Sequence, residues 1–504
     1  MGYWNTDLKE KMSRYKKKTG ENKIGLTVTG YIILAIELVF SVIFEVLIVR
    51  AALLPALYEV LIGVVLAALL FVMWLLIRKN YKRVRYIIGD IISLLLSAAM
   101  IAGSLAVGDL TSALKSITDT TEEVTRVGVY VRADDSAETI QDAADYPFGI
   151  LESRLREDTD NAISQIEEEI SDSISTSEYT GMSGLADALL SEEVDAMIIS
   201  EDFVEMLTEA EGYEDFEDEV REIASYEWVN IVASEDSEDS SEDSSAQTNP
   251  EDCFIMYISG IDTYGSVSTK SRSDVNILAA VNTSTREILL VSTPRDYYVE
   301  LSISDGEKDK LTHAGIYGVN VSMETLEMLY DINIDYYFRI NFTGFEDLID
   351  ALGGITVDSE YSFEVGDHTF VEGENYLDGE AALAFARERY SFSSGDRQRG
   401  ENQMAVIEGV IDKLLTPAIL QNFSDILDGL EGSFETDMSY DYLSDLVQMQ
   451  LSEGGSWNVT SYSVDGTGTY ATTYSMDQSL YVMIPDESTL EEAQSLINAV
   501  LSGE

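Results

Sequence analysis

Arginine and aspartate side chains recur in the second half of the chain in patterns suited to binding phosphate. Arg272 and Asp274 stand in a Ser-Arg-Ser-Asp stretch, and Arg295 follows in Ser-Thr-Pro-Arg-Asp. A guanidinium group offers a planar fork that binds phosphate oxygens bidentately and stays charged. Such groups at strand and helix ends are expected to meet at one cleft of an α/β fold. The candidate arginines are Arg272, Arg295, Arg387, Arg389 and Arg399.

Two aspartates offer the oxygen ligands that a cation needs. Asp262 follows one expected strand, and Asp274 precedes another. Magnesium is usually bound through only one or two protein carboxylates together with phosphate oxygens and water. A metal between the aspartates and the phosphates would offset their mutual repulsion and stabilise charge on a leaving group. The pattern therefore predicts a phosphate site with Mg²⁺, for which Mn²⁺ is an alternative.

Ordinary ion pairing is the alternative for each arginine taken singly. Arg387 and Arg389 flank Glu388 and could form salt bridges at a helix end, and Arg295 precedes its own potential partner Asp296. Taken as a set, the arginines favour a phosphate site, because they stand out against a strongly acidic background.

That background follows from the charges. The net charge of −61 argues against nucleic acid as a partner, since binding it requires a basic surface. Of the 31 Lys and Arg, 13 precede residue 108, whereas only 7 of the 92 Asp and Glu do. The remaining chain thus holds 18 basic and 85 acidic residues, a net charge of −67.

Three apolar runs fill residues 24–107, following a basic tail at 1–23. Each run contains the roughly 20 apolar residues that a membrane-spanning helix needs, and the first is too long for a cleavable signal peptide. Basic residues fill the tail and the connection at 78–85, which places both in the cytoplasm and the chain after about residue 108 outside. Glu37 and Glu45 lie within the first run, and a carboxylate inside a membrane span indicates a function by default. The alternative is that one carboxyl is protonated and the other lies near the outer interface. We favour this alternative, because a simple membrane anchor offers no path for ions.

Beyond the membrane the sequence indicates two α/β domains separated by a linker. Residues 108–233 alternate short strands (127–131, 196–199) with helices (137–144, 155–174) and predict a small accessory domain. Residues 234–250 are acidic and Ser-rich, and a solvated linker is favoured over a calcium site because the glycine turn of a calcium loop is missing. Residues 251–504 form the last domain.

The last domain alternates strands and helices, which predicts a mixed central sheet flanked by helices. The expected strands are 254–258, 275–281, 288–292, 355–357 and 481–484, and the expected helices are 322–330, 342–352, 379–387, 401–415 and 488–501.

Taken together, the motifs of residues 253–417 resemble the LytR–CpsA–Psr family. They comprise Gly-x-Asp, Arg-Ser-Asp, Ser-x-Pro-Arg-Asp, Lys-Leu-Thr-His-Ala at 310–314, Leu-Gly-Gly-Ile at 352–355, Arg-x-Arg, and Gly-Asp-x-x-Arg-Gly-x-Asn-Gln. Three spans and an accessory domain before this domain resemble the capsule-associated CpsA-like branch. The family's usual Tyr after Lys-x-x-His-Ala is replaced by Gly315, and Arg397 falls at a variable place in the pattern.

The resemblance implies a membrane-bound phosphotransferase that moves a cell-wall glycopolymer, capsular polysaccharide or teichoic acid, from a polyprenyl-pyrophosphate carrier to peptidoglycan with magnesium. Asp262 and Asp274 would bind the metal, Asp262 would assist proton removal, and Arg295 would act in catalysis. The polyprenyl tail would lie in an apolar tunnel between sheet and helices. The pyrophosphate ligands would be Arg272, Arg295, Arg387, Arg389, Arg399 and Gln403.

The sequence leaves two other functions open. Hydrolysis would make the protein a polyprenyl-pyrophosphate pyrophosphatase, and a non-catalytic lipid-binding regulator of the envelope is a third possibility. His313 is either a general base or, as favoured, a neutral residue that stabilises a loop. Cys253 cannot form an intramolecular disulfide and is expected to be structural, because it is the sole cysteine and has no catalytic partner nearby in sequence. No Cys/His spacing predicts zinc.

Overall fold

The computed structural model describes residues 28–77, 83–118, 122–231, 253–261, 267–416, 432–476 and 478–503. The chain divides into two compact units. One comprises Met1–Lys115 with Tyr440–Gly455, and the other comprises Ser116–Ser439 with Ser456–Glu504. Asp262, the linker at 234–250 and the whole basic N-terminal tail at 1–23 lie outside the described residues.

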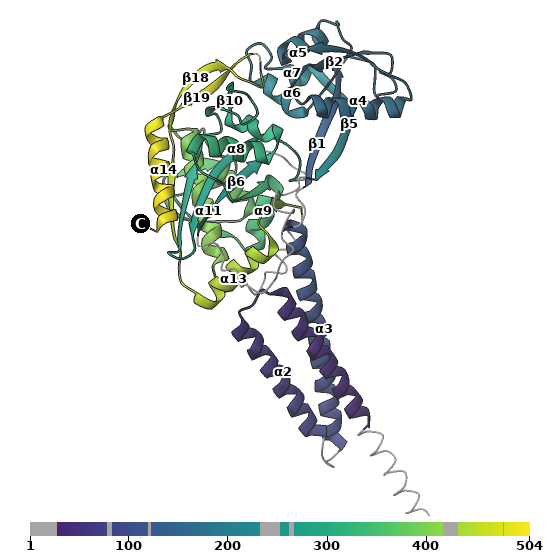
Figure 1. Cartoon of the computed structure of the whole chain (residues 1–504), viewed down its shortest axis with the longest axis vertical. Helices are drawn as coiled ribbons and strands as arrows, with labels where there is room; N and C mark the ends of the chain where they lie inside the picture. The colour runs from purple at the N-terminus through teal and green to yellow at the C-terminus, as the bar shows by residue number, and fades with distance from the viewer. Residues whose placement is uncertain are drawn as a thin grey trace, which may run out of the picture. The chain divides into compact units, whose positions relative to one another are not determined.

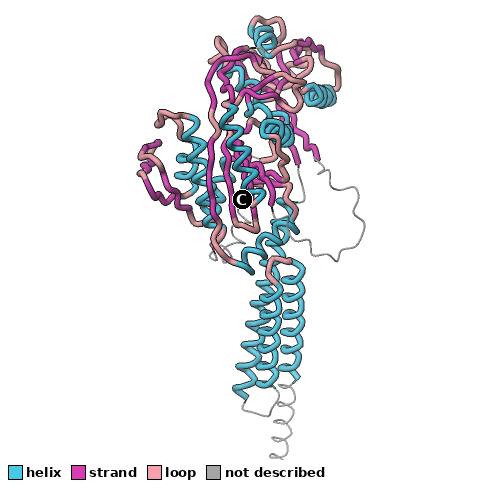
Figure 2. The backbone as a smooth tube through the Cα atoms, turned by 60° about the vertical axis from the view of Figure 1, so that its left-hand side comes forward, coloured by secondary structure: helices cyan, strands magenta, loops and turns pink. Residues whose placement is uncertain are grey.

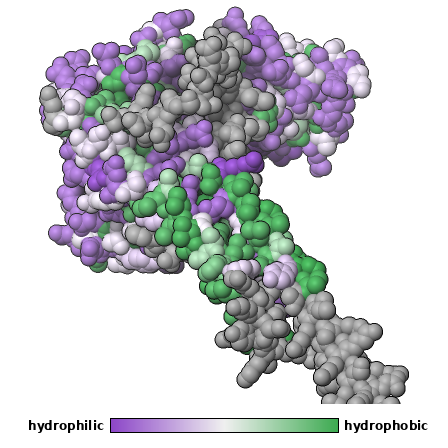
Figure 3. All heavy atoms as spheres, turned by 60° about the horizontal axis from the view of Figure 1, so that its bottom comes forward, coloured by the Kyte–Doolittle hydropathy of each residue, from purple (hydrophilic) through white to green (hydrophobic). Residues whose placement is uncertain are grey.

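The first unit contains three helices that are long and apolar enough to cross a membrane. The spans are Val28–Ala51, Ala56–Leu76 and Ile87–Gly108, of which the second lies in α2 (Ala56–Ile77) and the third in α3 (Arg83–Thr118). Hydrophobic side chains cover these helices, whereas the second unit is mainly hydrophilic on its surface (Figure 3). The three expected spans are therefore present as helices.

Polar contacts fasten the first unit at two places. The fully buried Glu37 carboxylate accepts a hydrogen bond from the Ser93 hydroxyl, so one of its two oxygens has a partner on a different helix. Helix α13 (Tyr440–Glu453), which the sequence did not reveal, belongs to this unit. The Tyr440 hydroxyl donates to the carbonyl of Ala51 at 2.5 Å, at the turn that follows the first span.

The accessory domain has a five-stranded mixed sheet in the order β3-β2-β4-β1-β5. Side chains of β1 alternate between two apolar cores, because successive residues of a strand point to opposite faces: Val129 belongs to one core and Tyr130 to the other. The helix expected at 137–144 is wrong, because this segment forms turns. The strands are β1 (Glu122–Arg132), β2 (Pro147–Leu151), β3 (Ser175–Tyr179), β4 (Ala196–Ile199) and β5 (Val220–Ile231), and the helices are α4 (Arg156–Ile170), α5 (Met182–Leu190), α6 (Glu201–Thr208) and α7 (Phe216–Glu219).

The last domain is built on a six-stranded sheet in the order β16-β11-β6-β7-β8-β17. Figure 1 labels β6, one of its central strands. The pairs β11–β6 and β17–β8 are parallel and the others are antiparallel, which confirms the expected mixed sheet. The strands are β6 (Cys253–Ile261), β7 (Ser273–Asn282), β8 (Glu287–Ser292), β11 (Tyr336–Asn341), β16 (Phe434–Thr436) and β17 (Asn458–Ser463).

Helices pack against the long strands, which run side by side in Figure 2. Helices α8 (Val319–Tyr330) and α14 (Glu487–Ser502) share one apolar core with β6, β7 and β8. Helices α9 (Phe342–Ala351), α10 (Gly379–Arg387) and α11 (Asp396–Leu414) share a second core with a small sheet, β12 (Ile355–Ser359) and β15 (Gly373–Leu377). The two-stranded sheets β9 (Tyr298–Glu300)–β10 (Lys308–Lys310), β13 (Phe363–Val365)–β14 (His368–Phe370) and β18 (Gly466–Thr472)–β19 (Ser479–Pro485) complete the domain with the 3₁₀ helix η2 (Leu311–Tyr317).

Local sequence signals explain several boundaries. Asn341 and Asp378 cap α9 and α10, because their side chains accept hydrogen bonds from backbone N–H groups of the first turn. Gly353 and Gly354 follow α9 with φ of 71° and 79°, a conformation that favours glycine. Helix α11 begins at Asp396 instead of residue 401, so Arg399 and Gln403 lie one turn apart on the same helix.

One buried carboxyl in this domain gives a pH-dependent prediction. Burial raises the pKa of Asp437 to about 6, although its carboxylate accepts a hydrogen bond from the Tyr337 N–H at 2.8 Å. Because the folded pKa exceeds the unfolded value, the stability that this group contributes is present below pH 3.8 and is lost as the pH rises through about 6. Asp437→Asn should therefore raise the unfolding temperature at pH 8 but not at pH 4, by the equivalent of about 3 kcal/mol. Thermal unfolding in detergent measures this, and the largely exposed Asp134→Asn is the control. An equal shift of Asp437→Asn at both pH values would contradict it.

Candidate functional site

A small, partly open pocket lies where β8 and β17 end and α11 begins. The N-terminus of a helix favours anions, since its first N–H groups lack partners and the helix dipole is positive there. Gly400 allows α11 to approach the sheet, because a Cβ at this position would lie 2.6 Å from the Ser292 hydroxyl oxygen. The lining residues are Asp274, Ser292, Thr293, Pro294, Arg295, Asp396, Arg397, Arg399, Gly400, Gln403, Ser463 and Val464.

The centre of the pocket is an ion pair between Arg295 and Asp274. One guanidinium nitrogen, Nη1, lies 2.8 Å from both carboxylate oxygens, and the Thr312 hydroxyl adds a contact at 3.3 Å. Burial alone would raise the pKa of Asp274, but the positive charges of Arg295, Arg399 and Arg272 hold this pKa below its usual value. Asp274 is thus a carboxylate, and three of the expected arginines lie within electrostatic reach of it.

Helix α11 contributes the second half of the pocket. Arg399 lies 2.5 Å from Asp396 in the first turn, and Gln403 follows one turn later. Burial raises the pKa of Asp396, an effect that Arg399 opposes and that the negative charge of Asp296 reinforces. Asp396 was not among the expected site residues, although the Gly-Asp-x-x-Arg motif contained it.

Arg272 lies apart from these lining residues and pairs with the accessory domain. Its guanidinium group contacts Glu205 of α6 and, at 3.2 Å, Glu209. Lys310 lies 2.5 Å from the same Glu209 and 3.3 Å from Asp296. Lys310 and Glu209 were missed by sequence reasoning: the lysine stood in a recognised motif, whereas nothing in the sequence linked Glu209 to the last domain.

Besides Arg272, two further expected ligands do not line the pocket. The Arg387 guanidinium stacks on the Phe342 ring at 4.2 Å, and Arg389 lies over Tyr390 at 4.8 Å. Arg389 is nevertheless near enough to lower the pKa of Asp396. The salt bridges expected between these arginines and Glu388 are not among the described contacts; the pair expected between Arg295 and Asp296 is an electrostatic interaction, whereas the direct ion pair of Arg295 is with Asp274.

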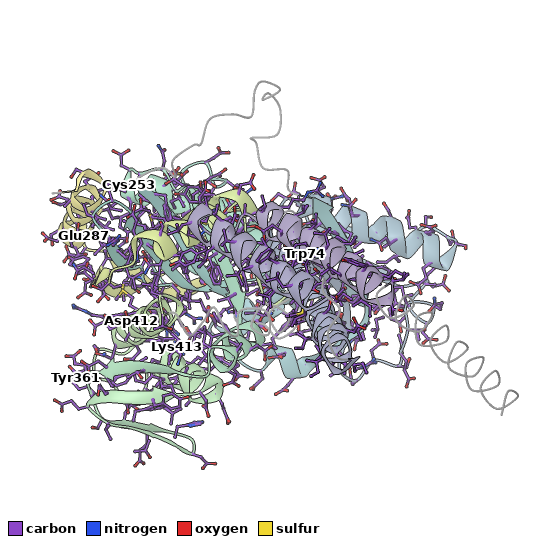
Figure 4. All side chains as sticks on the ribbon, turned by 90° about the horizontal axis from the view of Figure 1, so that it is seen from below. Trp74, Cys253, Glu287, Tyr361, Asp412 and Lys413 are labelled. Carbon is purple, nitrogen blue, oxygen red and sulfur yellow. The ribbon has the colours of Figure 1, made fainter. Side chains whose placement is uncertain are left out.

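The two histidines and the cysteine have contacts outside the pocket. His313 Nδ1 lies 2.6 Å from Asp309, and both side chains are fully buried next to Lys310, which fits a loop-stabilising role. His368 lies 3.7 Å from Glu380. The Cys253 thiol, labelled in Figure 4, donates to the Leu501 carbonyl at 3.2 Å.

The electrostatics of the site bear on whether a metal fits. Five cations in or near the pocket already have carboxylate partners among the described residues, which compensates much of the positive charge that a polyanion would find there. Among the described residues no group of three or more His, Cys, Asp and Glu could hold a metal alone. Asp274 retains lone pairs beyond those used by Arg295, and a magnesium site needs only one or two protein carboxylates if the phosphates are also ligands. The cations in question are Arg272, Arg295, Lys310, Arg397 and Arg399.

Gly315 stands against the backbone that carries Arg272. A Cβ at this position would lie 2.4 Å from the Ser271 carbonyl oxygen and 2.9 Å from the Ser273 nitrogen. The space that a tyrosine would need is therefore filled by the main chain of 271–273. This contact explains why the chain carries glycine here.

Gly315→Ala tests this contact. The added methyl group should push the 271–273 backbone away, lower the free energy of unfolding by about 1–3 kcal/mol, and disturb Arg272 and Asp274. Thermal unfolding measures the loss. Gly184→Ala in α5 is the matched control, because nothing lies within 4 Å of its added Cβ and alanine favours a helix. Equal stability of both variants would show that the backbone is not closely packed at Gly315.

Known proteins are similar to about half of this chain. A model of the LytR_cpsA_psr family matches residues 224–495. A polyisoprenyl-teichoic acid–peptidoglycan teichoic acid transferase, TagU, of Enterococcus faecalis is 33% identical over 261 residues, which cover 51% of this chain and 83% of that protein. TagU of Bacillus subtilis is 32% identical over 251 residues, covering 50% of this chain and 78% of that protein. The crystal structure of B. subtilis TagV is similar with a TM-score of 0.43 and 29% identity, covering 50% of this chain and 98% of that one.

Proposed function

The chain belongs to the LytR_cpsA_psr family, and from that premise we propose that it transfers a cell-wall glycopolymer from a polyprenyl-pyrophosphate carrier to peptidoglycan. The observation that carries the proposal is the pocket in which Arg295, Arg399 and Gln403 converge with Asp274 at the start of α11. Teichoic acid is the favoured polymer, since the similar proteins are named for it. Capsular polysaccharide shares the same pyrophosphate linkage and remains the alternative.

In the proposed reaction a peptidoglycan sugar hydroxyl attacks the phosphorus next to the polymer. A new O–P bond forms, the bridging P–O bond of the pyrophosphate breaks, and polyprenyl phosphate leaves. The hydroxyl proton passes to a carboxylate, for which Asp262 is the preferred candidate. Arg295 and Arg399 bind the phosphate oxygens, and they stabilise the charge that develops on the transferred and leaving groups.

Magnesium fits the donor set of this site. Asp274, together with Asp262, would hold it, and Mn²⁺ would serve as a substitute. When bound, the metal supplies the positive charge that the paired arginines and lysine lack, and so reduces the repulsion between Asp274 and the phosphates. Arg272, Arg387 and Arg389 complete the proposed pyrophosphate ligands, the latter two after a change from their present ring contacts.

The proposed location follows from the three apolar helices. They would anchor the chain in the cell membrane with the basic N-terminal tail in the cytoplasm and the pocket outside, where peptidoglycan lies. The polyprenyl tail would remain close to the lipid phase, and it would enter the apolar interior between the sheet and α11.

Arg295→Ala tests the proposal. The full-length protein in liposomes would be supplied with a polyprenyl-pyrophosphate-linked glycan, peptidoglycan oligomers and Mg²⁺, and the linked product measured by mass spectrometry. Loss of the central arginine should lower transfer by about a hundredfold or more, since it removes a transition-state contact and leaves Asp274 unpaired. The matched control is Arg156→Ala, which breaks ion pairs on the accessory domain with Asp160 and Glu178 and should retain activity. Absence of transfer by the unaltered protein, with binding only or with water as acceptor, would refute the proposal.

Metal removal provides a separate prediction. Chelation should abolish transfer, and Mg²⁺ or Mn²⁺ should restore it, because carboxylates already compensate much of the positive charge in the pocket. Asp274→Asn should raise the magnesium concentration for half-maximal rate by about tenfold or more. Full activity in excess chelator would contradict the metal requirement and leave the transfer reaction itself open to the preceding test.

A further inference from the structure

The segment that leads into Asp274 contacts the accessory domain at several successive residues. The Val124 N–H of β1 donates to the Ser268 carbonyl at 2.7 Å, and the Lys270 N–H donates to the Val124 carbonyl at 2.9 Å. The Lys270 ammonium lies 3.5 Å from the buried Glu123 carboxylate, and the Ser271 hydroxyl donates to Asp202 at 3.2 Å. Residues 268–271 are therefore held by backbone hydrogen bonds to β1 and by two acidic side chains of the accessory domain.

Arg272 continues this series of contacts into the site. Two accessory carboxylates, Glu205 and Glu209, contact its two terminal guanidinium nitrogens, and its side chain is 15% exposed. Burial would raise the pKa of Glu209, but Lys310 outweighs burial and holds this pKa below its usual value. The carboxylate is thus charged, and it links Arg272 to Lys310.

The two domains also share an apolar core. Ile316, Met476 and Leu480 of the last domain are buried in the same cluster as the side chains of α5 and α6. The Glu123 carboxylate accepts a hydrogen bond from the Val319 N–H, the first residue of α8, at 3.1 Å. Such packing fixes α6 relative to the site, so that carboxylates on and directly after α6 act from a rigid support.

We propose that Glu205 and Glu209 of the accessory domain are positioning residues that hold Arg272 in the orientation needed to bind the pyrophosphate. This inference rests on the proposed function. A guanidinium group has five N–H donors, and the two glutamates occupy only one on each terminal nitrogen. The remaining donors stay available for phosphate oxygens, while the side chain is held in place before the substrate binds.

The accessory domain accordingly contributes to substrate binding, because two of its acidic side chains position Arg272. A free arginine would lose rotamer freedom each time a phosphate bound, whereas the glutamates impose that order during folding. Glu209 also forms an ion pair with Lys310. Lys310 in turn pairs with Asp296, the residue that follows Arg295.

A double-mutant cycle tests the proposal with the full-length protein in liposomes and the transfer assay described above. Glu205→Gln/Glu209→Gln should lower kcat/KM by about tenfold, and Arg272→Ala by at least as much. In the Arg272→Ala background the glutamine substitutions should change kcat/KM by less than about twofold, because the group they position is missing. Glu209→Asp should retain more activity than Glu209→Gln, since it keeps the charge. Glu201→Gln is the matched control: Glu201 lies on the same helix but pairs with Arg126 of its own domain.

The outcomes separate this proposal from its premise. If the unaltered protein transfers no polymer, the proposed function fails. If it does transfer, three results would overturn the positioning role: unchanged activity of the glutamine variant, an equal loss with and without Arg272, or a gain in activity, which would mean that the glutamates compete with the pyrophosphate. Matching unfolding temperatures of the variants and the control exclude a loss through misfolding.

Discussion

The largely buried ion pair of Arg295 and Asp274 is the interaction on which the site depends, because in the proposed function a strongly acidic protein binds a polyanion. Unpaired arginine and lysine side chains would attract the surrounding acidic side chains. In this fold the cations of the site are instead paired with specific carboxylates. The 2.8 Å contacts from Arg295 to both oxygens of Asp274 keep the two groups at the ends of adjacent strands. Helix α11 then adds Arg399 with Asp396 from the opposite wall. In the proposed mechanism a magnesium ion would add positive charge to this balanced site and so offset the substrate's negative charge.

The same constraint extends across the domain boundary. Arg272 and Lys310 find their carboxylates on the accessory domain, and the shared apolar core makes that partnership a fixed part of the fold. The replacement of a family tyrosine by Gly315 fits this arrangement. Once the backbone at 271–273 is pressed against η2, only a residue without a side chain fits. The accessory domain and Gly315 thus both help to hold Arg272 in place.

The sequence revealed those features that depend on local pattern. Apolar runs predicted three spans, the alternation of strand and helix segments predicted the mixed sheet, and the start and end of α10 were predicted at 379–387. Motif resemblance brought Asp274, Arg295, Arg399 and Gln403 into one hypothesis, and all four line one pocket. Two features escaped the sequence for different reasons. The segment 137–144 has helical spacing but forms turns with local side-chain hydrogen bonds, such as that from the Thr139 hydroxyl to Asp142. Glu209 pairs with Lys310 across 101 residues of chain, a contact that no local pattern encodes. The proposed roles of Arg387 and Arg389 stay predictions, since both guanidinium groups lie over aromatic rings in this structure.

Transfer of the polymer to a sugar hydroxyl is the central claim, and the source of the oxygen in the product tests it most directly. The full-length protein, a polyprenyl-pyrophosphate-linked glycan and peptidoglycan oligomers would be incubated in water labelled with heavy oxygen, and the polymer phosphate analysed by mass spectrometry. Transfer predicts a peptidoglycan-linked phosphodiester without the label, because the attacking oxygen comes from the sugar. Labelled phosphate on free polymer, with no linked product, would show that water is the acceptor and would contradict the account.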